Sequence, residues 1–176
     1  KSHRGSKDRE VIRFQEEEYH ICMRLIKNDL PYKLDMHLKK HKPKGAAING
    51  IPIRKAGELF GVVNLVFFSP EDLNLIKEGP SGRRKFLDLE LCQLDKIYLS
   101  NLQNYNKIII QRNKLLKDIV FRPKLEETLD MWDAQLLQYG KQMIAKRREF
   151  IWQLNEIIQD IHASLTGGKE ILELKY

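Results

Sequence analysis

Apolar side chains recur at every second position in residues 19–25 and again in residues 32–38. This period of two is typical of a β-strand that has one buried face and one wet face. The polar pair Asn28-Asp29 lies between the two stretches and favours a turn. The pattern therefore predicts an antiparallel hairpin. Asn49-Gly50 predicts a further hairpin turn, because both residues readily adopt a positive φ.

Residues 62–68 form the longest apolar run, Val-Val-Asn-Leu-Val-Phe-Phe. A nearly continuous run of β-branched and aromatic residues is typical of a strand that is covered on both faces. We expect a short turn of helix over residues 56–60 just before it. The run is interrupted by Asn64 and is far too short to span a bilayer.

From Ser69 onward the spacing of apolar residues becomes helical. Ser69 followed by Pro70 predicts a helix start, with serine as N-cap and proline at the first helical position. The stretch Gly79-Pro80-Ser81-Gly82 breaks this helix, and a second helix is expected to follow it. Asp95 predicts the cap of a third helix, which ends before Pro123.

A long helix is predicted from Pro123 to Leu165, and Gly167 is available for a left-handed C-cap. Its apolar residues follow spacings of three and four that resemble a coiled-coil seam. These residues are Leu125, Leu129, Trp132, Leu136, Tyr139, Met143, Phe150, Leu154, Ile157 and Ile161. The seam is interrupted at Lys146-Arg147-Arg148, and we expect these three side chains on the wet side of the helix.

Together these elements predict an α+β fold, in which an antiparallel β region precedes a helical arm made of a long α-hairpin. The apolar alternation in residues 170–176 predicts a final strand that returns toward the sheet. We expect domain limits at 1–78 for the β part, 79–166 for the arm and 167–176 for the returning strand. The chain opens on Lys1 rather than Met and ends on this strand, so we expect it to be a piece of a larger protein.

The positive charge is concentrated in the first third of the chain. The net charge is +7. Residues 1–55 carry 14 Lys and Arg against 7 Asp and Glu, whereas residues 56–176 carry 17 of each. A local cationic surplus favours a partner that bears phosphate, although a merely solvated surface would have the same composition. Cys22 and Cys92 are distant and unpatterned, which predicts buried thiols in a reducing cytoplasm rather than a disulfide.

The sequence contains no complete catalytic centre. Thr166-Gly167-Gly168-Lys169 lacks the glycine spacing and the strand-to-helix order of a phosphate-binding loop, so we interpret it as a helix C-cap. Ser69 lacks the flanking glycines of a nucleophile elbow. No two histidines have the spacing of metal ligands on one helix face, and a metal shared by His37 and His41 has little support.

Several cationic side chains are candidates for contact with a nucleic-acid backbone. One group surrounds the predicted Asn49-Gly50 hairpin. Another, Arg83-Arg84, opens a helix, where cations oppose the helix dipole and so indicate a specific contact. The candidate DNA-binding residues are Arg4, Lys7, Arg9, Lys39, Lys40, Lys42, Lys44, Arg54, Lys55, Arg83 and Arg84. The short loop containing Ser2, His3 and Arg4 has the hydroxyl, imidazole and guanidinium groups that hold an anion.

Several ordered motifs along the whole chain resemble the RecF family of bacterial recombination-repair ATPases, which are related to the SMC and ABC ATPases. The longest runs from Ser-Pro-Glu-Asp at residues 69–72 to Arg-Arg-Lys-Phe-Leu-Asp at residues 83–88. The others are Lys1-Ser2-His3-Arg4 with Ser6, Asp8 and Glu10, Val66-Phe67-Phe68, Leu73, Leu75-Ile76, Gly79-Pro80, Tyr98, Leu102, Tyr105, Gln111-Arg112-Asn113 and Leu115-Leu116.

The resemblance implies an ATP-controlled homodimer that binds DNA at junctions of single and double strands. It implies roles in replication, gap repair and the SOS response with the partners RecO and RecR, and no association with membranes. The β part would belong to an ABC-type ATPase lobe that uses ATP and Mg²⁺. The Walker A loop would precede Lys1, and the signature and Walker B motifs would follow Tyr176. We therefore expect this chain alone to be inactive as an ATPase, although the whole family is weakly active.

The resemblance also implies which residues lie near the nucleotide. These are Ser2, His3, Arg4, Ser69, Glu71 and Asp72. Residues 69–72 resemble the position of the Q-loop of related ATPases, but no glutamine is present there. An alternative function from a different class is a helical arm that binds a protein partner or a second copy without contacting DNA, because the apolar stripe on the long helix would also suit that purpose.

Overall fold

The computed structural model describes residues 8–77 and 79–176, and for residues 8, 9 and 56 it describes only the backbone. The chain divides into two compact units, with the division directly after Lys77. Each unit is described by itself below. Whether the units correspond to an ATPase lobe and an arm remains a prediction.

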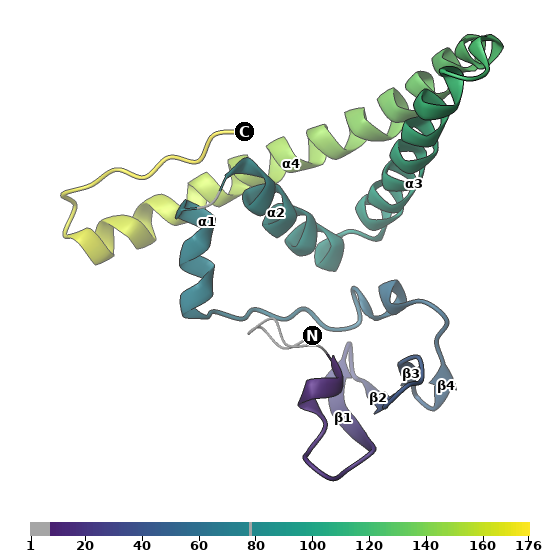
Figure 1. Ribbon diagram of the computed structural model, residues 1–176. Helices are drawn as coiled ribbons and strands as arrows, with labels where there is room; N and C mark the ends of the chain where they lie inside the picture. The colour runs from purple at the N-terminus through teal and green to yellow at the C-terminus, as the bar shows by residue number, and fades with distance from the viewer. Residues whose placement is uncertain (1–7, 78) are drawn as a thin grey trace. The chain divides into compact units, whose positions relative to one another are not determined.

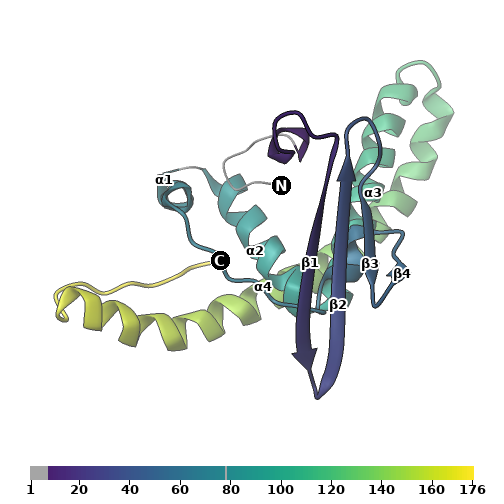
Figure 2. The same ribbon diagram turned by 90° about the horizontal axis from the view of Figure 1, so that it is seen from below.

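The first unit is built on a four-stranded antiparallel sheet with the order β1-β2-β3-β4 (Figure 2). The strands are β1 (Glu18–Lys27), β2 (Leu30–Lys39), β3 (Gly45–Ile48) and β4 (Ile51–Pro52). Both predicted turns are confirmed. Asn28 and Asp29 join β1 to β2 with φ of 50° and 60°, and Asn49 and Gly50 join β3 to β4 with φ of 50° and 80°. Left-handed backbone of this kind matches the twist of the flanking strands.

The register of the long hairpin confirms the predicted separation into an apolar face and a wet face. Ile21 is opposite Met36 on the apolar face, and His20 is opposite His37 on the wet face. A slip of one residue would exchange the two faces, so the alternation fixes the register. Leu38 at the end of β2 is buried.

Two predictions for this unit were wrong. No strand is assigned to residues 62–68 in the part of the chain that the structure describes, and Val66 is 98% exposed. A strand requires a neighbouring ladder of hydrogen bonds, and β propensity alone does not supply one. The second error concerns Cys22, which is exposed on the wet face of the hairpin, whereas Cys92 in the second unit is buried as expected. The alternation places Cys22 opposite Asp35, and this wet position decides its exposure.

Short helical segments complete the first unit. They are η1 (Asp8–Val11), η2 (Ala56–Leu59), η3 (Pro70–Leu73) and α1 (Asn74–Lys77). The predicted helix start at Ser69 is confirmed, although its first turn is a 3₁₀ helix. The carboxylate of Asp72 accepts a hydrogen bond of 2.7 Å from the backbone N–H of Ser69, which otherwise would have no partner at the helix start.

The second unit consists of α2 (Pro80–Leu94), α3 (Lys96–Ile119), η4 (Pro123–Thr128) and α4 (Leu129–Thr166). Figure 1 shows α3 and α4 side by side as a long α-hairpin, as the sequence predicts. Asp95 caps α3, because its carboxylate accepts hydrogen bonds from the N–H groups of Ile97 and Tyr98 at 2.7 and 3.0 Å. The first turns after Pro123 form a 3₁₀ helix, so α4 begins at Leu129, later than expected.

The core of this unit is a row of buried side chains from all three long helices. They are Leu87, Leu91, Cys92, Tyr98, Ile108 and Met143. Gly140 on α4 allows α3 to approach closely, because a Cβ atom there would lie 3.2 Å from Cε2 of Tyr105. None of the helices in the described ranges combines the length and apolar character needed to cross a membrane.

The prediction that Arg147 faces solvent was wrong. Its side chain is only 11% exposed, since position 147 continues the inward stripe four residues after Met143 and three before Phe150. Ile157 and Ile161 are exposed instead of lying in the expected seam. A straight helix has 3.6 residues per turn, so a strict seven-residue repeat drifts around it.

The end of the chain lies along α4 (Figure 1). Gly167 adopts the predicted left-handed cap conformation with φ of 62°. The side chain of Asn155 donates to the carbonyl of Leu174 at 2.9 Å and accepts from its N–H at 2.8 Å, so one amide satisfies both backbone groups. No strand is assigned to residues 169–176, and the returning strand remains a prediction.

Candidate nucleic-acid interface

The turn between β2 and β3 carries the densest group of predicted DNA-binding residues. It contains Lys40, His41, Lys42 and Lys44. Backbone hydrogen bonds hold it in place, from the N–H of Lys40 to the carbonyl of Glu17 at 2.9 Å and from the N–H of Lys42 to Lys39 at 3.2 Å. The turn is therefore a fixed part of the hairpin end.

A second pair of cations is brought to the same end of β3. Pro52 pairs with Ala47, and the N–H of Ile53 then donates to Ala46 at 2.9 Å. Continuation of this antiparallel register places Arg54 beside Gly45, the residue that follows Lys44. We call Lys42, Lys44, Arg54 and Lys55 the cationic end of β3.

The backbone around Arg54 and Lys55 is arranged so that both side chains are exposed. The N–H groups of these two residues donate to Oε1 of Glu58 at 3.1 and 2.9 Å, which caps the start of η2. The carboxylate of Glu58 thus accepts hydrogen bonds from backbone N–H groups. Exposed cations of this kind gain energy from phosphates by releasing condensed counterions.

Other predicted cations are engaged in ion pairs. Nζ of Lys40 lies 2.9 Å from Oε1 of Glu17, and Nζ of Lys39 lies 3.3 Å from Oε2 of Glu18. The hydrogen bond from Lys40 lowers the pKa of Glu17, so this carboxylate stays ionised. In contrast, no ion pair involves Lys42 within the described ranges. Lys42 is therefore better placed than Lys39 or Lys40 to contact a phosphate.

Ion pairs engage part of the charge on the wet face of the hairpin. Asp35 lies 3.1 Å from Nζ of Lys33 and 2.9 Å from Nε2 of His20, and these hydrogen bonds, that of Lys33 first, lower the pKa of Asp35. Nε2 of His37 lies 3.4 Å from Glu18. No group of three metal-binding side chains occurs in residues 8–77 or 79–176 as far as they are described.

The predicted nucleotide-proximal residues are only partly described. Ser2, His3 and Arg4, like the DNA-binding candidate Lys7, lie outside the described residues, and Arg9 is described by its backbone alone.

The remaining nucleotide-proximal candidates lie at the start of η3. Ser69 is buried as the N-cap and Asp72 is used by that cap, while Glu71 is exposed in the first turn. The cap at the start of η3 accounts for the positions of Ser69 and Asp72 without a nucleotide. Their proximity to a nucleotide remains a prediction.

Arg83 and Arg84 are exposed in the first turn of α2, as the sequence indicates. They belong to the second unit, and their contact with DNA remains a prediction.

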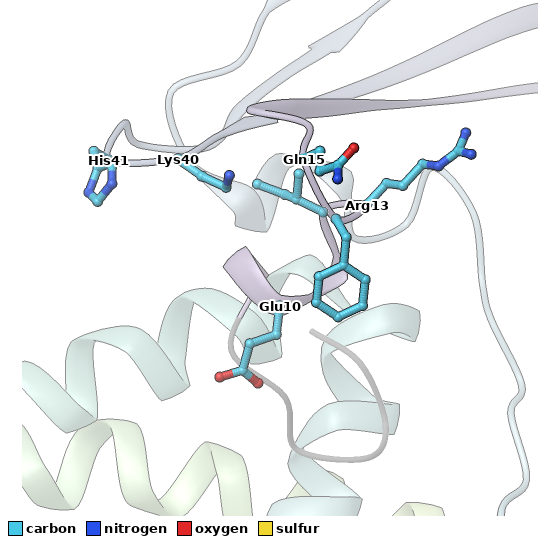
Figure 3. A pocket seen from close by; sticks show the side chains of 7 residues that line it. Glu10, Arg13, Gln15, Lys40 and His41 are labelled. Carbon is cyan, nitrogen blue, oxygen red and sulfur yellow. The ribbon is translucent and has the colours of Figure 1, made fainter.

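Sequence reasoning missed a pocket at the entry to the hairpin (Figure 3). It has a volume of about 480 Å³ and is lined by Glu10, Ile12, Arg13, Phe14, Gln15, Lys40 and His41. The available signal was the pair Arg13-Phe14, an aromatic residue beside a cation in a polar segment.

Known proteins provide an independent comparison. No family model matches the chain. The protein named DNA replication and repair protein RecF of Agathobacter rectalis is 65% identical over 176 residues, and that of Lachnospira eligens is 62% identical over 178 residues. Both alignments cover 100% of this chain and 49% of the relative.

A solved structure of the recombination mediator protein RecF-ATP in the RecFOR pathway superposes with a TM-score of 0.85 and 34% sequence identity. The superposition covers 94% of this chain and 44% of the chain in that structure. The chain spans about half the length of the curated relatives that it matches. High identity along its whole length and the shared arrangement of sheet and helices lead to one conclusion: the chain belongs to the RecF family.

Proposed function

We propose that this chain forms part of a RecF-like recombination mediator in the cytoplasm. The mediator would bind DNA at junctions of single and double strands as an ATP-dependent homodimer, and would act in gap repair with RecO and RecR. The family relationship supports this role. The observation that supports DNA contact is the cationic end of β3, where the strand register brings two cationic segments to the same end of one strand.

The chemistry of this surface suits a phosphate backbone rather than a base sequence. Lysine ammonium groups are mobile point charges, and contacts of this kind position a protein on DNA without reading sequence. Two cations on the wet face of the adjacent hairpin, Lys33 and Lys39, are engaged by its own carboxylates. The attraction for phosphate is therefore expected to be stronger at the turn than along the strands.

The glycine pair at the end of α4 does not have the form of a phosphate-binding loop. Gly167 and Gly168 end a helix, so no helix N-terminus points at a phosphate there, as a nucleotide loop requires. We propose that residues of the full-length protein outside this chain supply the phosphate loop and hold Mg²⁺. We derive no ATPase step from the residues described here.

A salt titration of DNA affinity tests the role of the cationic end of β3. The variant Lys42→Ala/Arg54→Ala is compared with Lys114→Ala/Lys117→Ala, which removes the same charge from exposed positions of α3. We expect the first variant to weaken binding to all DNA sequences and to reduce the salt slope by roughly 1 for each lost phosphate contact. Equal salt slopes for both variants would argue against this surface.

The second candidate function is binding of a protein by the helical unit. Its specific support is the exposed pair Val120-Phe121 at the junction of α3 and η4, together with the exposed Trp152 on α4. Trp132 and Leu136, which the sequence suggested for this role, are half-buried. Loss of self-association or RecR binding in Phe121→Ser, with unchanged DNA affinity, would favour this function.

A further inference from the structure

The pocket at the entry to the long hairpin combines an apolar lining with a charged rim. Ile12 is buried and Phe14 contributes an aromatic ring to the lining, whereas Arg13, Lys40 and His41 contribute the cationic or ionisable groups of the rim. Its volume of about 480 Å³ lies within the usual range of roughly 300–1,000 Å³ for ligand sites. The combination indicates a ligand with a flat apolar part and a negative charge.

Phe14 is 97% exposed, although it adjoins this pocket. The exposed ring of Phe14 therefore contributes no burial free energy to the folding of this unit. An exposed apolar group beside a pocket is typical of an interaction site. An exposed aromatic face is the group on which bases of single-stranded DNA stack, and the base sequence matters little because every base has such a face.

The charges around the ring restrict how a nucleotide strand would lie. Figure 3 shows Lys40 and His41 on one side of the pocket, Arg13 on the other, and Glu10 apart from all three. A phosphate beside Glu10 would be repelled, whereas a phosphate beside Arg13 would be attracted. The charge of Lys40 is largely offset by Glu17, whose Oε1 lies 2.9 Å from Nζ of Lys40.

The backbone holds this arrangement before any ligand binds. Gln15 has φ of 72° and His41 has φ of 62°, a left-handed conformation that residues other than glycine rarely adopt. The hydrogen bond of 2.9 Å from the N–H of Lys40 to Glu17 then joins the two sides of the pocket. A preformed site loses less entropy on binding.

We propose that this pocket takes one unpaired base of a DNA strand, stacked on Phe14, with a flanking phosphate beside Arg13. The inference rests on the proposed DNA-binding function and extends it, because it assigns to the hairpin entry the recognition of single-stranded DNA. A duplex would not satisfy the pocket, since its bases are stacked on one another. DNA is favoured over an apolar protein segment because Lys40 leads directly into the turn that carries Lys42 and Lys44.

The experiment measures the affinity of the full-length protein that carries this chain for three DNAs. These are a junction with a single-stranded arm, the same junction with abasic sugars throughout that arm, and a blunt duplex. The variants are Phe14→Leu, which keeps an apolar side chain without an aromatic face, and Phe14→Trp, which keeps the face.

For Phe14→Leu we expect about a tenfold loss of affinity for the ordinary junction. We expect no loss for the abasic junction or the duplex, and near-normal affinity of Phe14→Trp for all three. Thermal melting of each variant checks that folding is unchanged, which the exposure of Phe14 favours.

Other outcomes distinguish the base-binding pocket from the proposed DNA-binding function of the whole protein. Salt-dependent binding by all proteins with no difference between ordinary and abasic arms would overturn the pocket and leave the proposed function intact. An equal loss on all three DNAs, or unchanged DNA binding with a lowered melting temperature, would show that Phe14 packs against protein. Absence of wild-type binding to every DNA would overturn both proposals.

Discussion

Arg147 and Asp88 form a partly buried ion pair that joins α4 to α2. Nη2 of Arg147 lies 2.6 Å from Oδ1 of Asp88, and Nε lies 3.1 Å from the same oxygen. Nε also lies 2.8 Å from the hydroxyl of Tyr98 on α3, which itself donates to Asp88. Three helices therefore meet at one polar group. The hydroxyl of Tyr176 at the chain's end lies 3.2 Å from Nη1 of Arg147.

Burial and hydrogen bonding act in opposite directions on this arginine. Burial lowers the pKa of Arg147, but the hydrogen bonds that Arg147 donates to Tyr176, Asp88 and Tyr98 outweigh this effect, and the net pKa is raised. The guanidinium therefore stays charged, and it stabilises the fold only while its hydrogen-bond partners are present.

Replacement of Arg147 by Met should lower the free energy of unfolding by about 2 kcal/mol, because Asp88, which is 21% exposed, would lose its charge-assisted hydrogen bonds. Urea denaturation followed by circular dichroism measures the change. The matched control is Arg148→Met at the next, exposed position, for which we expect a change within about 0.5 kcal/mol. Equal effects of the two substitutions would contradict this account.

Tyr98→Phe should lower the free energy of unfolding by about 1–2 kcal/mol, because it removes a hydrogen-bond donor to Asp88 while keeping the ring. Tyr98 is 1% exposed, so water cannot replace the lost donor. Denaturation of the single variants and of Tyr98→Phe/Arg147→Met gives the coupling between the residues. We expect coupling of at least about 0.5 kcal/mol, and additive losses would show that the three groups do not act together.

The two cysteines should differ in reactivity at pH 8. Cys22 is exposed, whereas Cys92 is buried, and burial together with the charge of Asp88 raises the pKa of Cys92 to about 11. A chromogenic disulfide reagent should therefore modify one thiol quickly in the folded protein and the second only after unfolding. Cys22→Ser should abolish the fast reaction, and a fast reaction that survives this substitution would show that Cys92 is accessible.

The same thiol gives a pH dependence with a definite sign. The folded protein holds the proton of Cys92 to a higher pH than the unfolded chain, whose thiol titrates near 9.0. The unfolded state therefore loses protons first, and the contribution of this group to stability falls as pH rises from 9.0 to about 11. Urea midpoints across this range measure the fall, and Cys92→Ala should make the dependence shallower.

Gly140→Ala should have different effects in two backgrounds. Alanine favours a helix over glycine by about 1 kcal/mol. Its Cβ would lie 3.2 Å from Cε2 of Tyr105, which opposes that gain. We expect the full stabilisation only in a Tyr105→Leu background, where the ring is removed. Urea denaturation of the four proteins measures this, and the same change in both backgrounds would show that the Tyr105 ring moves aside freely.

Local features of the chain were predictable because their causes are local. Asn28 and Asn49 adopt left-handed backbone since their short polar side chains tolerate it, and Gly167 does so because it has no Cβ atom. Ser69 and Asp95 begin helices because a nearby carboxylate, that of Asp72 or of Asp95 itself, reaches backbone N–H groups within a few positions. The period of two in the hairpin likewise fixed its register.

The candidate interface was only partly predictable. The cluster of lysines around the β2–β3 turn was evident from the sequence, but which lysines are engaged by Glu17 and Glu18 depends on strand pairing. The pocket beside Phe14 also required the structure, because residues 10–15 and residues 40–41 line it together only after the hairpin has formed.

The sequence by itself determined the turns, the helix caps, the α+β order and, through its motifs, the resemblance to the RecF family. Only the tertiary structure decided the roles of side chains whose partners are distant in sequence. Arg147 in a basic triplet looks solvated, yet it is buried because Asp88, 59 positions away, supplies a carboxylate. Residues 62–68 look like a strand, yet the structure assigns none to them. Both outcomes have one physical reason: burial and strand pairing depend on the neighbouring segment, and local propensity does not specify that neighbour.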